Sequence, residues 1–369
     1  MQKRISMAMP VFNGKEKDYL DECIETGWVS ANGRFVTEFE EKFAEFCNVK
    51  YALSCSNGTV ALHLCLLSLG LGAGDEVIMP TLTYIATANC VRYCGATPVF
   101  VDSDALTFNI DASKIEEKIT SRTKAILPVH LYGLPCDMDA IQAIAKKHNL
   151  FVIEDAAEAH GAMYNGKRVG SIGDVAAFSF FGNKIITSGE GGMVVTNNKD
   201  LYERIKLLKG QGVDPHKRYW HSIVGYNYRM TNMQAAVGLA QLENVEWHMA
   251  QRIRVMELYK SEFNGYSEWL RMQETPRGRT NVYWMNNVVL SGSIEKSRDQ
   301  VMSEMEARNI EMRPVFYPMH IMPPYYCKEA HFPVAEGIAA RGISLPSHAL
   351  LSQQDVRWIC DSMKEICGL

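Results

Sequence analysis

The sequence has no long apolar run, no large excess of one charge and no CxxC pair, and each absence excludes a class of protein. No stretch approaches the ~20 apolar residues that span a bilayer, and no apolar block of signal-peptide length follows Met1. A net charge of −4 argues against nucleic acid as the main partner. The ten scattered cysteines indicate buried thiols in a reducing compartment. We therefore expect a cytoplasmic protein without disulfides or bound metal.

Short apolar runs alternate with helical patterns through the first 210 residues. The runs are Tyr51–Ser54, Glu76–Met79, Thr97–Val101, Ala125–Val129, Leu150–Glu154, Val175–Phe180 and Gly192–Thr196, and the helical patterns are Thr59–Leu69, Tyr84–Tyr93, Met138–His148 and Leu201–Leu208. Apolar residues on consecutive positions are typical of strands covered on both faces. The alternation predicts an α/β sheet of about seven mostly parallel strands.

The pattern changes near residue 232, where Asn232–Phe263 predicts one long linking helix. The later elements are a strand at Val282–Leu290 and helices at Glu295–Arg308 and Gln353–Ile366. The chain of 369 residues is long enough for two cores. We expect a large domain at 1–245 and a smaller C-terminal α+β domain at 246–369.

Lys184 follows a predicted strand end and precedes a glycine-rich loop, in SFFGNKIITSGEGG at 179–192. A lone loop lysine is most often simply solvated. Here its flanks are apolar residues and small hydroxyls, and a lysine withdrawn from water has a lowered pKa. It then presents a neutral amine to an aldehyde, as Schiff-base chemistry requires.

Other strand ends carry groups that suit a phosphorylated pyridine ring. Asp155 ends a buried strand, where an acid often only begins a turn but can also pair with a protonated pyridine nitrogen. Ser56–Thr59 opens a helix, which suits either a plain N-cap or a phosphate bound by free N–H groups. Ser179 is a second phosphate candidate, and Tyr84 fits ring stacking and core packing equally well. No GxxxxGK[ST] loop is present, nor GxGxxG after the first strand.

Together these blocks resemble the DegT/StrS family of sugar-nucleotide aminotransferases, which are fold-type I enzymes dependent on pyridoxal 5′-phosphate (PLP). The resemblance extends from Gly27 to Ser347. It rests on the combination of SNGTVAL at 56–62, GDEVIMP at 74–80, EDAA at 154–157 and the Lys184 segment with GEGG at 189–192.

The resemblance implies a role for each residue. Lys184 holds PLP as a Schiff base and later moves a proton between cofactor and substrate carbon. Asp155 pairs with the ring nitrogen, and Tyr84 stacks on the ring. The implied phosphate contacts are Gly58, Thr59 and Ser179, with Asn227 from a neighbouring subunit. The protein is therefore expected to be a homodimer with two shared active sites.

One position departs from the family pattern. After Asp-Ala-Ala the family usually carries Gln, which contacts the phenolic oxygen of the ring, whereas this chain carries Glu158. A carboxylate beside a phenolate is repulsive unless a proton is shared. Either Glu158 is protonated, or the protonation of the cofactor differs, or the side chain points elsewhere.

Several segments between residues 155 and 325 concern the substrate. Their resemblance implies transfer of an amino group from L-glutamate to C4 of a nucleotide-linked 4-keto-6-deoxy sugar. The expected substrate is GDP-4-keto-6-deoxy-mannose, and the product would serve O-antigen or another surface polysaccharide. Arg313, Tyr317 and His320 are candidates for the sugar-nucleotide side, because a diphosphate calls for Arg or His donors. A surface arginine and a packed aromatic cluster explain them equally well.

Four alternatives stay open. The same chemistry could act on a UDP- or dTDP-linked keto sugar, at C3 or C4. A sugar 3-dehydratase of the family would carry His at the lysine position, so Lys184 favours transamination. A PLP-binding regulator would need a DNA-binding module, for which no segment is spare. A scaffold without turnover would not convert PLP and glutamate to pyridoxamine phosphate.

Overall fold

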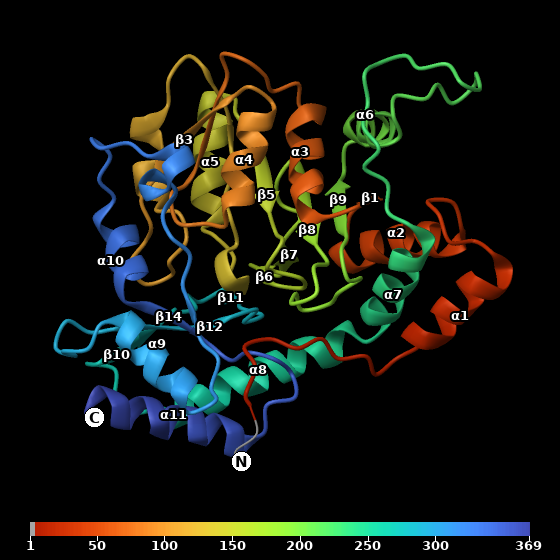
Figure 1. Ribbon diagram of the computed structural model, residues 1–369. Helices are drawn as coiled ribbons and strands as arrows, with labels where there is room; N and C mark the ends of the chain where they lie inside the picture. The colour runs from red at the N-terminus through yellow and green to blue at the C-terminus, as the bar shows by residue number, and fades with distance from the viewer. Residues whose placement is uncertain (1–3) are drawn as a thin grey trace.

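The computed structural model describes residues 4–369, and its largest unit is a seven-stranded sheet (Figure 1). The strands are β1 (Tyr51–Cys55), β2 (Glu76–Pro80), β3 (Thr97–Val101), β4 (Thr123–Ile126), β5 (Phe151–Asp155), β8 (Val175–Ser179) and β9 (Gly192–Thr196). Their order is β1-β9-β8-β5-β4-β2-β3, and within this sheet only β9 is antiparallel to its neighbours. The predicted α/β sheet is confirmed, although the strand predicted at Ala125–Val129 begins two residues earlier and ends three residues earlier.

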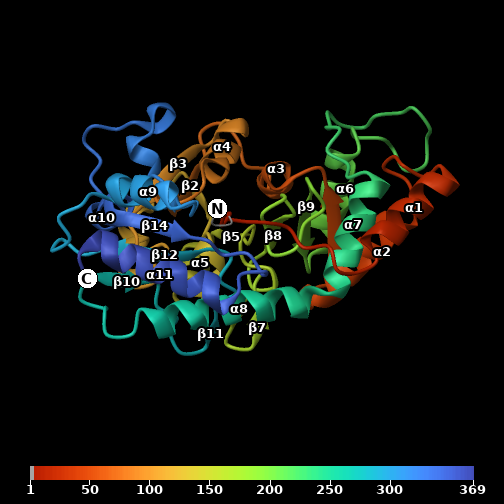
Figure 2. The same cartoon turned by 60° about the horizontal axis from the view of Figure 1, so that its bottom comes forward.

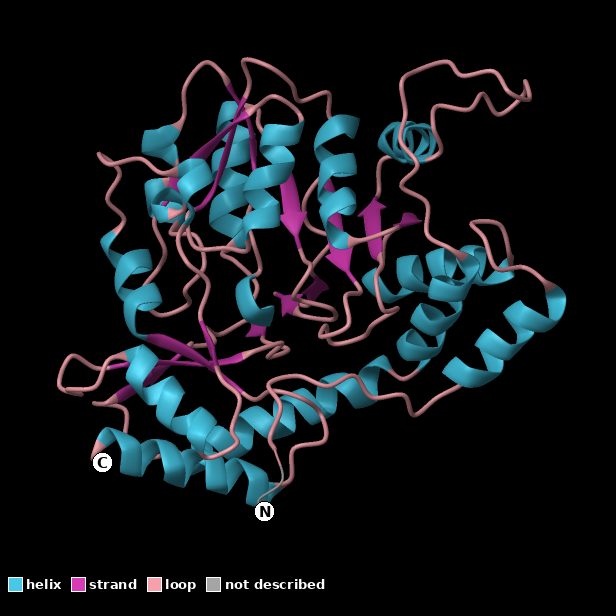
Figure 3. Ribbon diagram, in the orientation of Figure 1, coloured by secondary structure: helices cyan, strands magenta, loops and turns pink. Residues whose placement is uncertain are grey.

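Helices cover both faces of this sheet (Figure 3). The covering helices include α3 (Gly58–Ser68), α4 (Ile85–Tyr93), α5 (Met138–His148) and α6 (Lys199–Lys209). Successive residues of β2 enter different cores, because side chains alternate across a strand. Val77 packs in the same core as Leu64 of α3, and Ile78 packs in the same core as Ile141 of α5. With both faces covered, the strand ends are the place left for a ligand.

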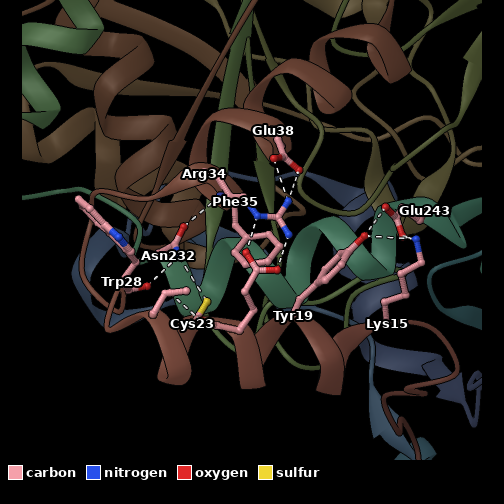
Figure 4. A network of polar contacts seen from close by, with 11 residues as sticks. Lys15, Tyr19, Cys23, Trp28, Arg34, Phe35, Glu38, Asn232 and Glu243 are labelled. Carbon is pink, nitrogen blue, oxygen red and sulfur yellow. Dashed lines mark hydrogen bonds and ion pairs between the residues drawn. The ribbon is translucent and has the colours of Figure 1, made fainter.

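Two N-terminal helices that the sequence did not predict, α1 (Glu16–Thr26) and α2 (Arg34–Cys47), pack against α7 (Asn232–Glu243). Figure 4 shows the polar contacts that join them. Arg34 of α2 donates to Glu22 of α1. The Asn232 side chain accepts the Phe35 N–H at 3.1 Å and donates to the Trp28 carbonyl at 2.7 Å.

The single long helix predicted at Asn232–Phe263 is wrong, because the chain forms α7 and then α8 (Val245–Glu262). Asn244 separates them with φ −108° and ψ 15°, outside the helical region. Asparagine is a poor helix former because its side chain competes for backbone hydrogen bonds. The break lies beside the predicted domain boundary at residue 245.

The C-terminal part builds a second sheet, ordered β10-β12-β14-β13. The helices α8 and α11 lie side by side below it in Figure 1 and come forward in Figure 2. Its elements are β10 (Leu270–Met272), β12 (Asn286–Leu290), α9 (Arg298–Ala307), β13 (Arg313–Pro314), α10 (Pro333–Arg341), β14 (Gly342–Leu345) and α11 (Gln353–Cys367). The strand predicted from Val282 begins only at Asn286, since Tyr283 adopts a left-handed φ of 49°. Val288, Ile359 and Val255 share a second core, which Ile5 also joins.

A small three-stranded sheet lies between these units. It contains β6 (Met163–Tyr164), β7 (Lys167–Arg168) and β11 (Arg279–Thr280). The pairing of β11 with β6 joins the C-terminal half to the first. None of the helices formed by residues 4–369 has the length and apolar content to cross a membrane. The division at 1–245 and 246–369 stays a prediction.

Candidate active site

A cavity of about 680 Å³ lies where β2, β5 and β8 end. Eight of the site residues singled out from the sequence line it: Gly58, Thr59, Tyr84, Asp155, Glu158, Ser179, Lys184 and Arg313. Asp155 and Ser179 are the last residues of their strands, and Thr59 lies in the first turn of α3. They meet because parallel strands end at the same edge of a sheet.

The side chain of Lys184 extends from the loop after β8 and lies over the ring of Trp284. Its Nζ lies 3.8 Å from the centroid of the Trp284 ring. Burial lowers the pKa of this amine, and the carboxylates of Glu158 and Asp155 oppose that shift. At neutral pH a larger fraction of such an amine is neutral than of a solvated lysine, and only the neutral form can attack a carbonyl carbon or accept a proton.

The carboxylate of Asp155 is buried and held by two donors. Its oxygens accept the Thr87 hydroxyl at 2.9 Å and the Ala157 N–H at 3.2 Å. Burial raises the pKa of Asp155, and the Thr87 hydrogen bond counteracts this. A cationic partner would favour the ionised form, and a protonated pyridine nitrogen is such a partner.

The departure from the family pattern, Glu158, lies in the same cavity instead of pointing elsewhere. Its Oε2 accepts the backbone N–H of Tyr132 at 2.7 Å. Tyr132 donates this bond from a left-handed conformation, with φ 59°. Burial raises the pKa of Glu158 to about 7, although the neighbouring Lys184 ammonium lowers it. The carboxyl group therefore gains and loses its proton near neutral pH.

The N-terminus of α3 provides the third element of the site. The side chain of Asn57 caps the helix by accepting the Val60 N–H, which leaves the N–H groups of Gly58 and Thr59 directed out of the helix. A Cβ at residue 58 would lie 2.6 Å from the Cβ of Ser179, so only glycine fits. Backbone donors at a helix N-terminus are suited to a phosphate.

These residues fit PLP. The helix N-terminus with Ser179 suits the phosphate, the buried Asp155 suits a protonated ring nitrogen, and Lys184 supplies an amine of lowered pKa. Tyr84 also lines the cavity and packs with Phe316.

The other predicted site residues lie in different surroundings. Arg313 lines the cavity but is exposed and paired with Glu311 at 3.0 Å. Asn227 is exposed and lies outside this cavity, on the segment between α6 and α7 that extends from the body of the molecule (Figure 1). Tyr317 and His320 do not reach the cavity. Tyr317 accepts a bond from Arg298, and His320 is buried between Thr81 and Glu336.

Several residues of the site were not predicted from the sequence, and three of them contact its ionisable groups. Thr87 holds Asp155, Trp284 lies against Lys184, and Tyr132 binds Glu158. Thr87 lies in the first turn of α4. The direction of its side chain could have been inferred from where the predicted helix begins. Trp284 and Tyr132 reach the site through tertiary packing, for which the local sequence carries no signal.

Comparisons with known proteins agree with this geometry. The model of the DegT/DnrJ/EryC1/StrS aminotransferase family matches residues 11–364. The chain is 54% identical to GDP-perosamine synthase of Caulobacter vibrioides and 50% identical to that of Escherichia coli O157:H7, with 98% of each chain covered in both cases. The crystal structure of DesV from S. venezuelae superposes with a TM-score of 0.90 at 35% identity, covering 96% of this chain and 95% of the other.

Proposed function

The chain belongs to the DegT/DnrJ/EryC1/StrS aminotransferase family, a family of PLP-dependent enzymes, and we propose that it makes GDP-perosamine. The reaction would move an amino group from L-glutamate to C4 of GDP-4-keto-6-deoxy-mannose. The similarity to two GDP-perosamine synthases over nearly the whole chain is the observation that carries this proposal. The product would enter O-antigen or another surface polysaccharide, and the enzyme would work in the cytoplasm.

When bound, PLP supplies a ring that withdraws electrons from the carbon bearing the amino group. Asp155 would hold the proton on the ring nitrogen, which keeps the ring electron-withdrawing. The Nζ of Lys184 would take the proton from Cα of glutamate and later deliver one to C4 of the sugar. Trp284 and Tyr132 would limit the access of water to that amine.

Lys184→Ala tests the catalytic assignment. Transamination and the visible absorbance of lysine-bound cofactor should both disappear. Lys146→Ala is the matched control, since Lys146 is exposed on α5, and it should retain both. Transamination by the Lys184→Ala protein would contradict the assignment.

The substrate proposal needs a panel of keto-sugar nucleotides with glutamate, in which release of 2-oxoglutarate is measured. The GDP sugar should react fastest. Activity on UDP- or dTDP-linked sugars with none on the GDP sugar would contradict the proposal. The enzyme would then aminate a sugar linked to another nucleotide. Arg313 is proposed to meet the diphosphate, so Arg313→Ala should raise KM for the sugar nucleotide and not for glutamate.

We further propose a homodimer in which Asn227 serves the partner's site. The segment that carries Asn227 exposes Tyr219, Trp220 and Val224, which are 81%, 53% and 89% exposed. Contiguous exposed apolar residues are typical of an interface. Inactive Lys184→Ala and Asn227→Ala proteins should regain activity when they are dissociated and mixed, because one site of each mixed dimer is intact. If verified mixed dimers regained no activity, the proposal that the two subunits share their active sites would be contradicted.

A further inference from the structure

Arg252 lies in the middle of α8 with a buried guanidinium. Its side chain is 4% exposed, and no carboxylate within residues 4–369 forms an ion pair with it. Burial lowers the pKa of Arg252 to about 10. A buried charge without a counterion is unfavourable unless polar groups surround it. The partners of its donors therefore indicate what the arginine does.

Those partners are three backbone carbonyls from three separate segments. Arg252 donates to Trp284 O at 3.1 Å and to Ser347 O, and its other terminal nitrogen reaches Lys184 O at 3.5 Å. The first two segments flank β12 and β14 of the C-terminal sheet, and the third is the loop after β8. One planar guanidinium thus joins the lysine loop to the second sheet.

Trp284 makes a second link between the same segments. Its indole Nε1 donates to Asn183 O at 2.9 Å, while its ring lies under the Nζ of Lys184. The carbonyls of two successive loop residues, 183 and 184, are therefore both held from the C-terminal part. Because Arg252 also holds the Trp284 backbone, removing it would loosen both links.

We propose that Arg252 is a positioning residue that fixes the Lys184 amine over Trp284 and within the cavity. It acts through backbone carbonyls and does not line the cavity itself. Its effect is to keep the amine buried opposite Asp155 and Glu158, the two carboxylates that face it. The inference rests on the proposed role of Lys184.

The first test needs no cofactor. The apoprotein is reductively methylated over a range of pH, and labelling of Lys184 is followed by peptide mass spectrometry. In Arg252→Met the loop can withdraw from the cavity, so the midpoint for Lys184 should rise by at least about half a pH unit towards that of an exposed lysine. The matched control is Arg254→Met, since within residues 4–369 Arg254 donates to Gln251 Oε1 and to the Ala349 and Leu351 carbonyls, all in the C-terminal part. The control should leave the midpoint unchanged.

The second test is kinetic. Arg252→Met should lower kcat about tenfold or more, with KM for glutamate changed less than about threefold, because a displaced group slows the chemical step more than binding. Arg252→Lys keeps the charge with fewer donors and should give an intermediate midpoint and rate. If the Arg252→Met protein does not fold, the same measurements on Arg252→Lys, with Arg254→Lys as its control, test the inference.

An unchanged Lys184 midpoint in the Arg252 variants, or an equal change in the Arg254 variants, would overturn the inference. The labelling result is independent of turnover. A shifted midpoint together with active Lys184→Ala protein would contradict the proposed function and leave the positioning intact.

Discussion

Glu158→Gln should change how the stability of the apoprotein depends on pH. The substitution keeps the size of the side chain and an oxygen that can accept the Tyr132 N–H, so the hydrogen bond at 2.7 Å is retained. What it removes is a buried group that titrates near neutral pH. Burial raises the pKa of Glu158 from an ordinary 4.5 to about 7. At about 1.4 kcal/mol per pKa unit, this difference corresponds to about 3 kcal/mol.

The sign follows from proton binding. Between about pH 4.5 and pH 7 the folded protein holds a proton on Glu158 that the unfolded chain has released, so its free energy of unfolding falls as the pH rises. Glutamine does not titrate. Across this range the free energy of unfolding of the Glu158→Gln protein should therefore come to exceed that of wild type by up to about 3 kcal/mol. Above about pH 7 this difference should stay constant.

Urea unfolding of both apoproteins, at one protein concentration and at several pH values from about 5 to about 8, measures this difference. The m values should agree, so that the change lies in the midpoints. Parallel pH profiles for the two proteins would refute the reasoning, because they would mean that Glu158 has the same pKa in both states. Lys184 should also titrate at lower pH in the variant, because it loses a neighbouring carboxylate.

Three further predictions concern neighbouring residues. Glu154→Gln should have the opposite pH dependence: burial raises the pKa of Glu154, but His130 and backbone N–H groups outweigh it and lower the pKa, so its stabilisation is lost as the pH falls. Urea unfolding should show a loss of at least about 1 kcal/mol at neutral pH and less in acid. Gly58→Ala should weaken PLP binding tenfold or more (~1.4 kcal/mol) in absorbance titrations, whereas Gly72→Ala, with its nearest atom 3.9 Å away, should not. Asp155→Asn should slow the glutamate half-reaction about a hundredfold or more in stopped-flow measurements.

The strands of the large sheet were predictable because their local sequence reflects their surroundings. Val77 and Ile78 pack on opposite faces of β2, and both are apolar because both faces are covered. The same reasoning placed Asp155 and Ser179 at one edge, since parallel strands end together. A helix N-cap at Ser56 or Asn57 was likewise readable from the residue types, and the structure has it at Asn57.

Backbone conformations set by tertiary contacts were not predictable. The helical pattern from Asn232 to Phe263 continues across Asn244, and one asparagine is too weak a signal to mark where one helix ends and the next begins. The strand predicted at Val282 is delayed because Tyr283 takes a left-handed φ. The same turn carries Trp284 to Lys184, so the missed break and the missed site residue have one cause.

The charges of the cavity indicate how Glu158 affects the protonation of the Lys184 amine. Two buried carboxylates, Asp155 and Glu158, face one buried amine, so full ionisation would leave a net negative charge withdrawn from bulk water. Burial accordingly raises the pKa of both acids. A cationic ring nitrogen would balance Asp155 and leave Glu158 and Lys184 to share the remaining proton. With glutamine at position 158, the proton would either stay on Lys184 or leave the site. Glutamate can hold the proton while Lys184 is neutral. Glu158 is therefore expected to set the pH at which the Lys184 amine becomes available.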